Sequence, residues 1–412
     1  MSFTTVTLVA AALVVARGIA QWWLERLNQN QIRANANRLP DAFRGVMDEL
    51  TYAKSVAYSL SNSRFNQFEA AYDAVLLLAV LCSGILPWAE HFFTPRSVWE
   101  QAIFLFATFT VMSLLSLPVQ WWDQFKLEER FGFNTTTQAT WWLDRAKSFV
   151  IGVMIGYPLL ALILKCVEWS GDWWWLWAWG VLLAFQLLMS VLAPVLILPL
   201  FNKLTPLPEG TLRDRLVALA GKTQFRAASI QVMDGSRRSK HSNAFFTGFG
   251  RFRKIVLFDT LITQLTEPEL EAVLAHEIGH WRKRHITKLL VISAVSSLGA
   301  FAVVACMARQ DWFAAGFGLR GASVSSSLLL FGLLAGTVLF WLSPLTHWWS
   351  RLHEYEADAF AREVIGNAQP LIGALRKLNG KNLSNLTPHP SYSSFYYSHP
   401  TLLERERALT SG

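Results

Sequence analysis

Two histidines and a glutamate lie close together in the segment EAVLAHEIGHWRKRH, residues 271–285. His276 and His280 are four residues apart, so on a helix both imidazole rings share one face and can bind one metal ion. Glu277 is then turned by about 100° around the helix axis, where its carboxylate can take a proton from a water beside that ion. This HExxH spacing predicts a zinc site that hydrolyses its substrate.

The alternative is a helix on which the two histidines merely pack against their neighbours. It is disfavoured because a chain with this histidine and glutamate content contains the pattern by chance only about once in seventy cases. His285 lies about 140° from His280 around a straight helix. We therefore expect His285 at the surface or behind a ligand, and not on the metal.

A catalytic zinc ion needs three protein ligands and one open position, so two histidines are not enough. The segment SRLHEYEADAFA, residues 350–361, offers the missing ligand. On a helix Glu354 and Asp358 share a face, whereas Glu356 points about 160° away from Asp358. We assign Glu354 as the third ligand and Asp358 as the carboxylate that accepts the free ring N–H of a ligand histidine. His353 is the alternative ligand, and a solvated acidic helix face is the alternative to a site.

The histidines require a helix of their own, and TEPELEAVLAHEIGHW, which begins at Thr266, has the signals for one. Thr266 is a plausible N-cap, Pro268 lies in the first turn, and Glu267 and Glu269 are favourable at the positive end of the helix dipole. Before this helix, SIQVMDGS, SNAFFTGFG and KIVLFD read as three short β-strands. The segment 202–287 is therefore expected to form a small α+β domain.

The rest of the chain has the composition of a polytopic membrane protein. Of its 412 residues 52% are hydrophobic and only 16% charged, and the 19 Trp and 28 Phe suit aromatic belts at a membrane interface. The three cysteines lie in apolar runs and suggest packing roles. A membrane-spanning helix takes about 20 apolar residues. Seven segments qualify, near residues 4–24, 71–90, 100–120, 148–168, 174–201, 288–308 and 326–346.

The basic residues orient these spans. The net charge of +8 comes from Lys and Arg in the connecting loops, which indicates topology and not a nucleic-acid partner. The connection after the second span carries only Arg96, whereas the first connection carries Arg26, Arg33, Arg38, Arg44, Lys54 and Arg64. The N-terminus is then outside and the C-terminus cytoplasmic. The first span is expected to remain uncleaved, because no positive charge precedes VTLVAAALVV.

Under this topology the two chemistry-bearing segments meet on the cytoplasmic side. We divide the chain into spans 1–5 with their loops (1–201), a cytoplasmic segment with the strands and the HExxH helix (202–287), spans 6–7 (288–346) and a C-terminal cytoplasmic segment with the third ligand (347–412). The expected fold class is an all-α polytopic membrane protein with a small α+β metalloprotease domain.

Several further segments extend the picture: HSNAFFTGF, KIVLFDTLI, AHEIGHW, SRLHEYEADAFA, SHPTLLERERAL, and LEERFGFNTTT at 127–137. Together, in this order, they resemble the integral-membrane zinc metalloproteases known as type I CAAX prenyl proteases. The resemblance covers most of the chain. It implies a barrel of seven transmembrane helices around a large water-filled chamber, with the zinc site at the cytoplasmic end.

The resemblance also assigns residues. It makes His276, His280 and Glu354 the ligands of one zinc ion per chain and Glu277 the general base, in agreement with the spacing argument. It adds three residues that spacing alone does not single out. It implies that His399 faces the scissile carbonyl as a polarising donor, that Arg405 completes a polar network around it, and that Asn243 marks the strand that holds an extended peptide.

We predict a zinc endopeptidase in the lipid bilayer, acting on a peptide or protein substrate that the family name describes as C-terminally prenylated. The ending ALTSG, without a dilysine tail, suggests a bacterial member in the inner membrane. One alternative is a quality-control protease for unfolded or membrane proteins that carry no prenyl group. An alternative of another class is a transporter, because Arg17 and Asp73 fall within or beside apolar spans.

Overall fold

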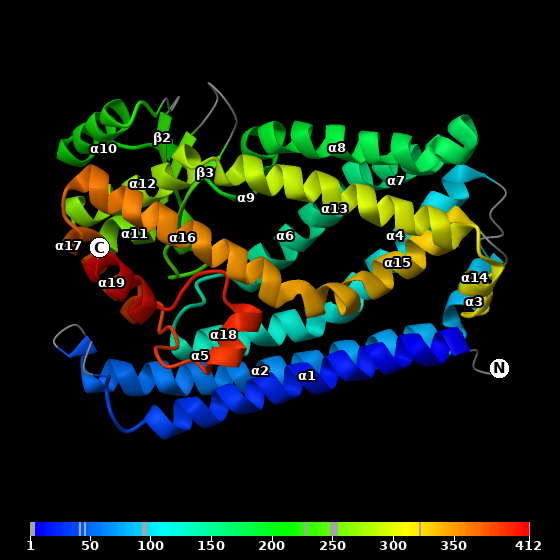
Figure 1. Ribbon diagram of the computed structural model, residues 1–412, viewed down its shortest axis with the longest axis horizontal. Coiled ribbons are helices and arrows are strands. Elements are labelled where there is room, and N and C mark those ends of the chain that lie inside the picture. Colours follow the sequence, from blue (N-terminus) through cyan, green and yellow to red (C-terminus); the bar gives the residue numbers. More distant parts are fainter. Residues whose placement is uncertain are drawn as a thin grey trace.

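The structure is a computed structural model, and it describes residues 5–40, 43–44, 47–92, 97–225, 229–247, 254–320 and 323–411. Long helices run side by side along the longest axis of the molecule (Figure 1). A small sheet and several shorter helices gather at one end, where the C-terminus also lies, and the N-terminus lies at the opposite end (Figure 1).

The long helices have the length and composition of membrane spans. Large apolar side chains that a soluble protein would bury point outward from them, for example Val75, Met154, Val295 and Leu345. The helices of this layer are α1 (Thr5–Asn35), α2 (Glu49–Cys82), α4 (Val98–Trp122), α6 (Gln138–Ile151), α7 (Tyr157–Ser170), α8 (Trp174–Leu192), α9 (Leu198–Phe201), α13 (His285–Ala308), α15 (Val324–Leu339) and α16 (Ser343–Ile365). The expected polytopic membrane architecture is confirmed.

Within the described residues, six continuous helical segments are long and apolar enough to cross a membrane. The segment from Gln138 to Phe201 contains a reversal at Gly171, whose φ of +52° is open to glycine, and α7 and α8 pack against each other on either side of it. It therefore holds two of the seven predicted spans. π-helical turns at 123–128, 152–156 and 193–197 join α4, α6 and α8 to the helices that follow them.

The second predicted span, near 71–90, is not one helix. α2 starts at Glu49, where Asp48 caps it by accepting a hydrogen bond from the Thr51 amide at 2.6 Å, and ends at Cys82. Gly84 has a φ of +81°, which ends the helix, and α3 (Ile85–Phe92) begins anew after it. The candidate crossing is therefore α2, and the apolar run past Gly84 belongs to a separate short helix.

The small domain is built on a four-stranded mixed sheet in the order β1-β2-β4-β3. The three predicted strands are present as β2 (Ser229–Met233), β3 (Ala244–Thr247) and β4 (Lys254–Phe258). β2 and β4 are parallel, and β3 pairs antiparallel with β4. β1 (Leu204–Pro206), which we did not predict, pairs antiparallel with β2. In this order β3 is an edge strand, which leaves one side of its backbone open within the described part of the chain.

Helix α12 (Glu267–Arg282) is the centre of the domain core. It begins with the predicted N-cap: Thr266 and Glu269 form a capping box. Leu270, Leu274 and Ile278 are almost fully buried. The other helices at this end are α5 (Glu129–Phe131), α10 (Thr211–Lys222), α11 (Asp259–Gln264), α17 (Gln369–Lys381), α18 (Pro390–Tyr396) and α19 (Leu402–Ser411), while α14 (Asp311–Ala315) lies at the far end with α3 (Figure 1).

A glycine allows α12 to pack closely on α16. A Cβ atom added at Gly279 would lie 3.0 Å from the Cα and 3.1 Å from the carbonyl oxygen of Ala357, tighter than nearly all real Cβ contacts. Ala357 is fully buried at this contact. Since His280 follows Gly279 directly and Glu354 lies one turn before Ala357, this contact sets the distance between the candidate ligands.

Candidate metal centre

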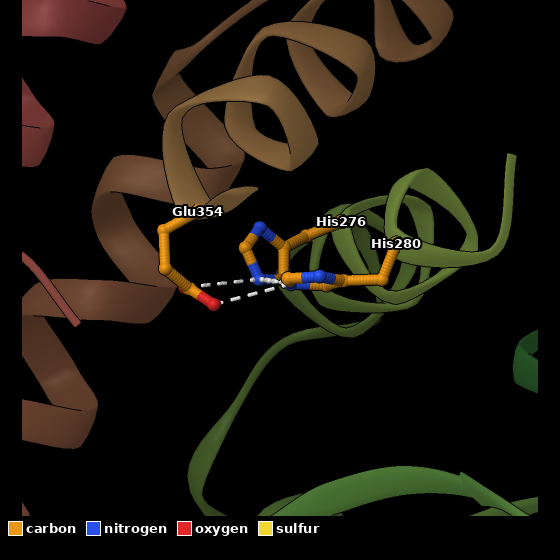
Figure 2. Close-up of side chains that lie close together, drawn as sticks. All are labelled: His276, His280 and Glu354. Atoms are coloured by element: carbon orange, nitrogen blue, oxygen red, sulfur yellow. Dashed lines mark hydrogen bonds and ion pairs between the residues drawn. The ribbon is translucent and has the colours of Figure 1, made fainter. Parts of the chain in front are cut away.

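Three predicted ligand side chains converge between α12 and α16. Figure 2 shows the imidazoles of His276 and His280, from one helix, facing the carboxylate of Glu354 from the other. The two Nε2 atoms are 3.1 Å apart. Glu354 Oε1 lies 3.2 Å from His280 Nε2, and Oε2 lies 3.5 Å from His276 Nε2. One ligand atom from each residue therefore lies within 4.8 Å of the others.

The atoms at this point fit a metal ion. Glu354 Oε2 is buried and accepts no hydrogen bond from any described residue, although buried polar atoms are normally paired. Two ring nitrogens face each other beside it, and a cation bound between them would satisfy a lone pair on each together with the carboxylate. Two imidazole nitrogens and one carboxylate oxygen are a donor set that zinc prefers.

His276 is held from behind by a carboxylate, as predicted for Asp358. Asp358 Oδ1 lies 2.8 Å from His276 Nδ1, so Nδ1 donates its hydrogen there and Nε2 keeps its lone pair for the cluster. Arg405 donates to both oxygens of Asp358, from Nε at 2.8 Å and from Nη2 at 2.6 Å. This forked, charge-assisted contact fixes the orientation of the carboxylate.

Arg405 is buried behind the candidate ligands. It is only 8% exposed and so is not a solvated charge. The resemblance places it in the polar network around the scissile carbonyl, and that role stays a prediction. Its bonds go to Asp358, and its Nη1 lies 3.5 Å from Glu354 Oε2. Its geometry is that of a residue that orients the cluster from behind.

His285 is buried and not at the surface. Arg284 adopts a left-handed conformation with a φ of +57°, which ends α12 and starts α13 in a new direction. The sequence left open a surface position and a position behind a ligand, and the structure has the second: the His285 side chain is 2% exposed, and its Nδ1 lies 3.0 Å from Nδ1 of His280. His353, the alternative ligand, stacks on the His285 ring and lies outside the cluster.

Glu277 lies between the two histidines on α12 and is half-buried. Its carboxylate forms no side-chain hydrogen bond within the described residues. Burial raises the pKa of Glu277, and the neighbouring His276 and His280 offset part of that rise. An uncommitted carboxylate with a raised pKa is suited to accept and return a proton.

His399 reaches the cluster from the segment between α18 and α19. Its Nε2 lies 3.4 Å from Glu354 Oε1, and its Nδ1 lies 3.0 Å from the Ser398 hydroxyl. Because the carboxylate can only accept, Nε2 carries the hydrogen and Nδ1 accepts from Ser398. The His399 side chain is 63% exposed, so it is a hydrogen-bond donor at the open side of the cluster.

His399 and Arg405 also line a polar cavity of about 570 Å³. Its walls come from distant parts of the chain, including α2 and the segment between α17 and α18. Six asparagine side chains line it: Asn28, Asn62, Asn66, Asn379, Asn382 and Asn385. Sequence reasoning missed them. The only signal was the asparagine-rich stretch NGKNLSNL, residues 379–386.

Asn243 stands directly before edge strand β3. It is exposed, and its Oδ1 accepts a hydrogen bond from the Ala244 amide at 2.8 Å. Its carbonyl accepts one from the Phe258 amide at 3.1 Å, which ties it to β4. β3 packs against α12, the helix that carries the histidines. An extended peptide paired with the open side of β3 would therefore run beside that helix.

Two family models match nearly the whole chain. The N-terminal region of CAAX prenyl proteases, described as five membrane helices, matches residues 28–203, and peptidase family M48 matches residues 206–411. The chain belongs to the type I CAAX prenyl protease family. CAAX prenyl protease 1 of Saccharomyces cerevisiae is 35% identical over 407 residues, which cover 92% of this chain and 89% of the yeast protein.

Other relatives agree. The Homo sapiens CAAX prenyl protease 1 homolog is 31% identical over 430 residues, covering 92% of this chain and 90% of the human protein. The crystal structure of S. mikatae Ste24p superposes with a TM-score of 0.91 at 33% identity, covering 98% of this chain and 99% of that one.

These comparisons confirm the predicted activity class. The chain is a membrane zinc metalloprotease, an enzyme that hydrolyses peptide bonds. The transporter alternative is not favoured, because a peptidase family accounts for all of the chain beyond residue 206.

Proposed function

We propose that one zinc ion per chain is held by His276, His280 and Glu354 and that the chain is an endopeptidase with its active site there. The observation that carries this proposal is the convergence of the three side chains around a buried carboxylate oxygen that accepts no hydrogen bond. Zinc bound there would polarise a peptide carbonyl and make a nearby water more acidic.

The surrounding residues would handle the proton and the substrate. Glu277 takes the proton from the attacking water and passes it to the leaving amine, for which its raised pKa is suited. His399 donates a hydrogen bond from Nε2 to the negative charge that develops on the carbonyl oxygen. Loss of such a donor costs about 10² to 10³ in rate. Asp358 orients His276 and is itself oriented by Arg405.

The substrate would bind in extended form. β3 offers an open backbone edge, and adding a peptide as one more strand is a common solution for sequence-tolerant binding. Asn243 marks the start of that edge. We propose that the peptide ends in a prenylated cysteine motif and is cut behind that cysteine, which is supported by the names of the relatives, CAAX prenyl proteases from yeast and human.

We further propose that the C-terminus and the small domain face the cytoplasm. The Lys- and Arg-rich first connection supports this orientation. The long helices separate the N-terminus from the small domain, as this topology requires (Figure 1).

The test uses the full chain purified in detergent. Zinc content is measured, and hydrolysis is followed with a farnesylated peptide and the same peptide without the farnesyl group, with Glu277→Gln as the matched inactive control. One zinc per chain with preferential cleavage of the farnesylated peptide supports the proposal. Equal cleavage of both peptides would overturn the substrate and favour the quality-control alternative, and a zinc-free wild-type protein would overturn the site.

A further inference from the structure

The two candidate histidine ligands are supported in different ways. His276 contacts a carboxylate directly, since its Nδ1 lies 2.8 Å from Asp358. Nδ1 of His280 instead faces a second imidazole, His285, at 3.0 Å. The other ring nitrogen of His285, Nε2, lies 2.8 Å from Glu356 Oε2. A carboxylate therefore stands behind each histidine, once directly and once through an intervening ring.

This chain of contacts allows a single arrangement of hydrogens when the imidazoles are neutral. The Glu356 carboxylate only accepts, so Nε2 of His285 must carry the hydrogen. The Nδ1 of His285 is then a bare acceptor, and Nδ1 of His280 must donate to it. The remaining nitrogen of His280, Nε2, keeps its lone pair and faces Glu354 at 3.2 Å. This relay, formed by Glu356, His285 and His280, thus leaves His280 in the tautomer that can bind a metal.

Several features of the fold hold the His285 side chain in place. The left-handed conformation at Arg284 is unfavourable for a non-glycine residue and persists only where the surroundings enforce it. It returns His285 to the side of His280. The His285 ring then stacks on His353, with ring centroids 3.9 Å apart and planes at 14°. Its side chain is 2% exposed, so its ring nitrogens have few partners besides His280 and Glu356.

Two partners of His285, His353 and Glu356, come from the helix that already supplies the third candidate ligand. Within α16, His353 stacks on the relay, Glu354 joins the cluster, Glu356 closes the relay, and Asp358 supports His276. Glu356 also lies 3.8 Å from the ammonium group of Lys288 on α13. The relay therefore connects the start of α13 to α16 across the end of α12.

We propose that His285 and Glu356 are positioning residues that fix the tautomer and ring orientation of His280 for metal binding. This inference rests on the proposed zinc site. Removing a partner of this kind weakens metal affinity by about 10 to 100-fold in proteins of known mechanism. The competing account is that His285 and Glu356 only pack the junction between α12, α13 and α16.

The experiment measures the zinc affinity of the full detergent-purified chain by competition with a chelator. Glu356→Ala removes the acceptor from a side chain that is 45% exposed, so the fold should tolerate the change. Glu356→Gln keeps an acceptor oxygen and serves as the conservative rescue. His285→Phe keeps a flat ring against His353 and removes both ring nitrogens. Glu363→Ala changes an exposed glutamate further along the same helix and is the matched control.

We expect Glu356→Ala and His285→Phe to weaken zinc binding by about 10 to 100-fold, with Glu356→Gln close to wild type and Glu363→Ala unchanged. The visible spectrum of the cobalt-loaded Glu356→Ala protein should differ from that of wild type, because the geometry around His280 changes. Zinc affinity and cobalt spectrum of Glu356→Ala equal to wild type would overturn the relay. So would a loss that Glu356→Gln fails to restore. A wild-type protein that binds no zinc would instead overturn the proposed function.

Discussion

Replacing Gly279 with alanine places a methyl group where α12 and α16 are closest. The new Cβ would lie 3.0 Å from the Cα, 3.1 Å from the carbonyl oxygen and 3.3 Å from the Cβ of Ala357. The two nearest atoms belong to the backbone of a fully buried residue, so no side chain can rotate away. The helices themselves must move apart.

The size of that movement can be compared with the tolerance of a zinc site. At contacts of 3.0–3.3 Å the neighbouring atoms must give way by a few tenths of an ångström. Zinc–ligand distances vary by only about 0.2 Å. His280 is next to Gly279 and Glu354 is one turn before Ala357, so the separation acts on the ligands directly. We expect zinc binding to weaken at least tenfold, or by about 1.4 kcal/mol.

Protein stability should change much less. Overpacking costs about 1–3 kcal/mol, while replacing a helical glycine with alanine returns about 1 kcal/mol. Gly221→Ala is the control, because a Cβ added there in α10 meets nothing within 4 Å and brings the same helix propensity. Zinc affinity is measured by chelator competition and stability by Tm. Equal zinc affinity in the two variants would refute the idea that this helix contact sets the ligand spacing.

Three further predictions follow from the same features. Glu277→Gln should lose about 10² to 10⁴ in hydrolysis while zinc content and Tm stay at wild type, and near-normal turnover would exclude Glu277 as the base. Burial raises the pKa of Glu269, but its hydrogen bonds from Lys377 and the N-cap lower the pKa more, to below 4.5. The stability that the ionised Glu269 contributes is therefore lost as pH falls below that value. Glu269→Gln should flatten the acid limb of a curve of Tm against pH, and an unchanged limb would contradict this. A topology reporter should read cytoplasmic after residue 64 and exported near residue 170, and the reverse pattern would invert the proposed orientation.

Much of the candidate site could be predicted from local sequence patterns. Four-residue spacing on a helix brought His276 and His280 to one face, and the same periodicity placed Glu354 and Asp358 together on α16. The Thr266 cap was predictable because capping depends on neighbouring residues. Each of these inferences uses only the geometry of a single regular element.

The failures occur where a regular element ends. Arg284 carries no sequence mark of a left-handed residue, so the sequence could not decide between a surface position for His285 and one behind a ligand. Gly84, in CSGIL, is such a sequence mark, but hydropathy averaged over a whole segment does not detect a single glycine. The prediction therefore joined α3 and the end of α2 in one span. β1 is only three residues long and depends on its pairing with β2. The asparagine-lined cavity needs segments hundreds of residues apart, and no local pattern could have assembled it.

The order of the candidate ligands along the chain has a consequence for biosynthesis. A ribosome that has released α12 has made both histidines, but Glu354 is synthesised only after α13 and α15, and it can meet the histidines only once both helices have been inserted into the membrane. Until both of these helices have crossed, the growing chain holds an incomplete donor set and no supporting Asp358. Assembly of the proteolytic centre is thus coupled to completion of membrane insertion. A nascent chain stalled before α16 would lack the third candidate ligand and would be an inactive precursor.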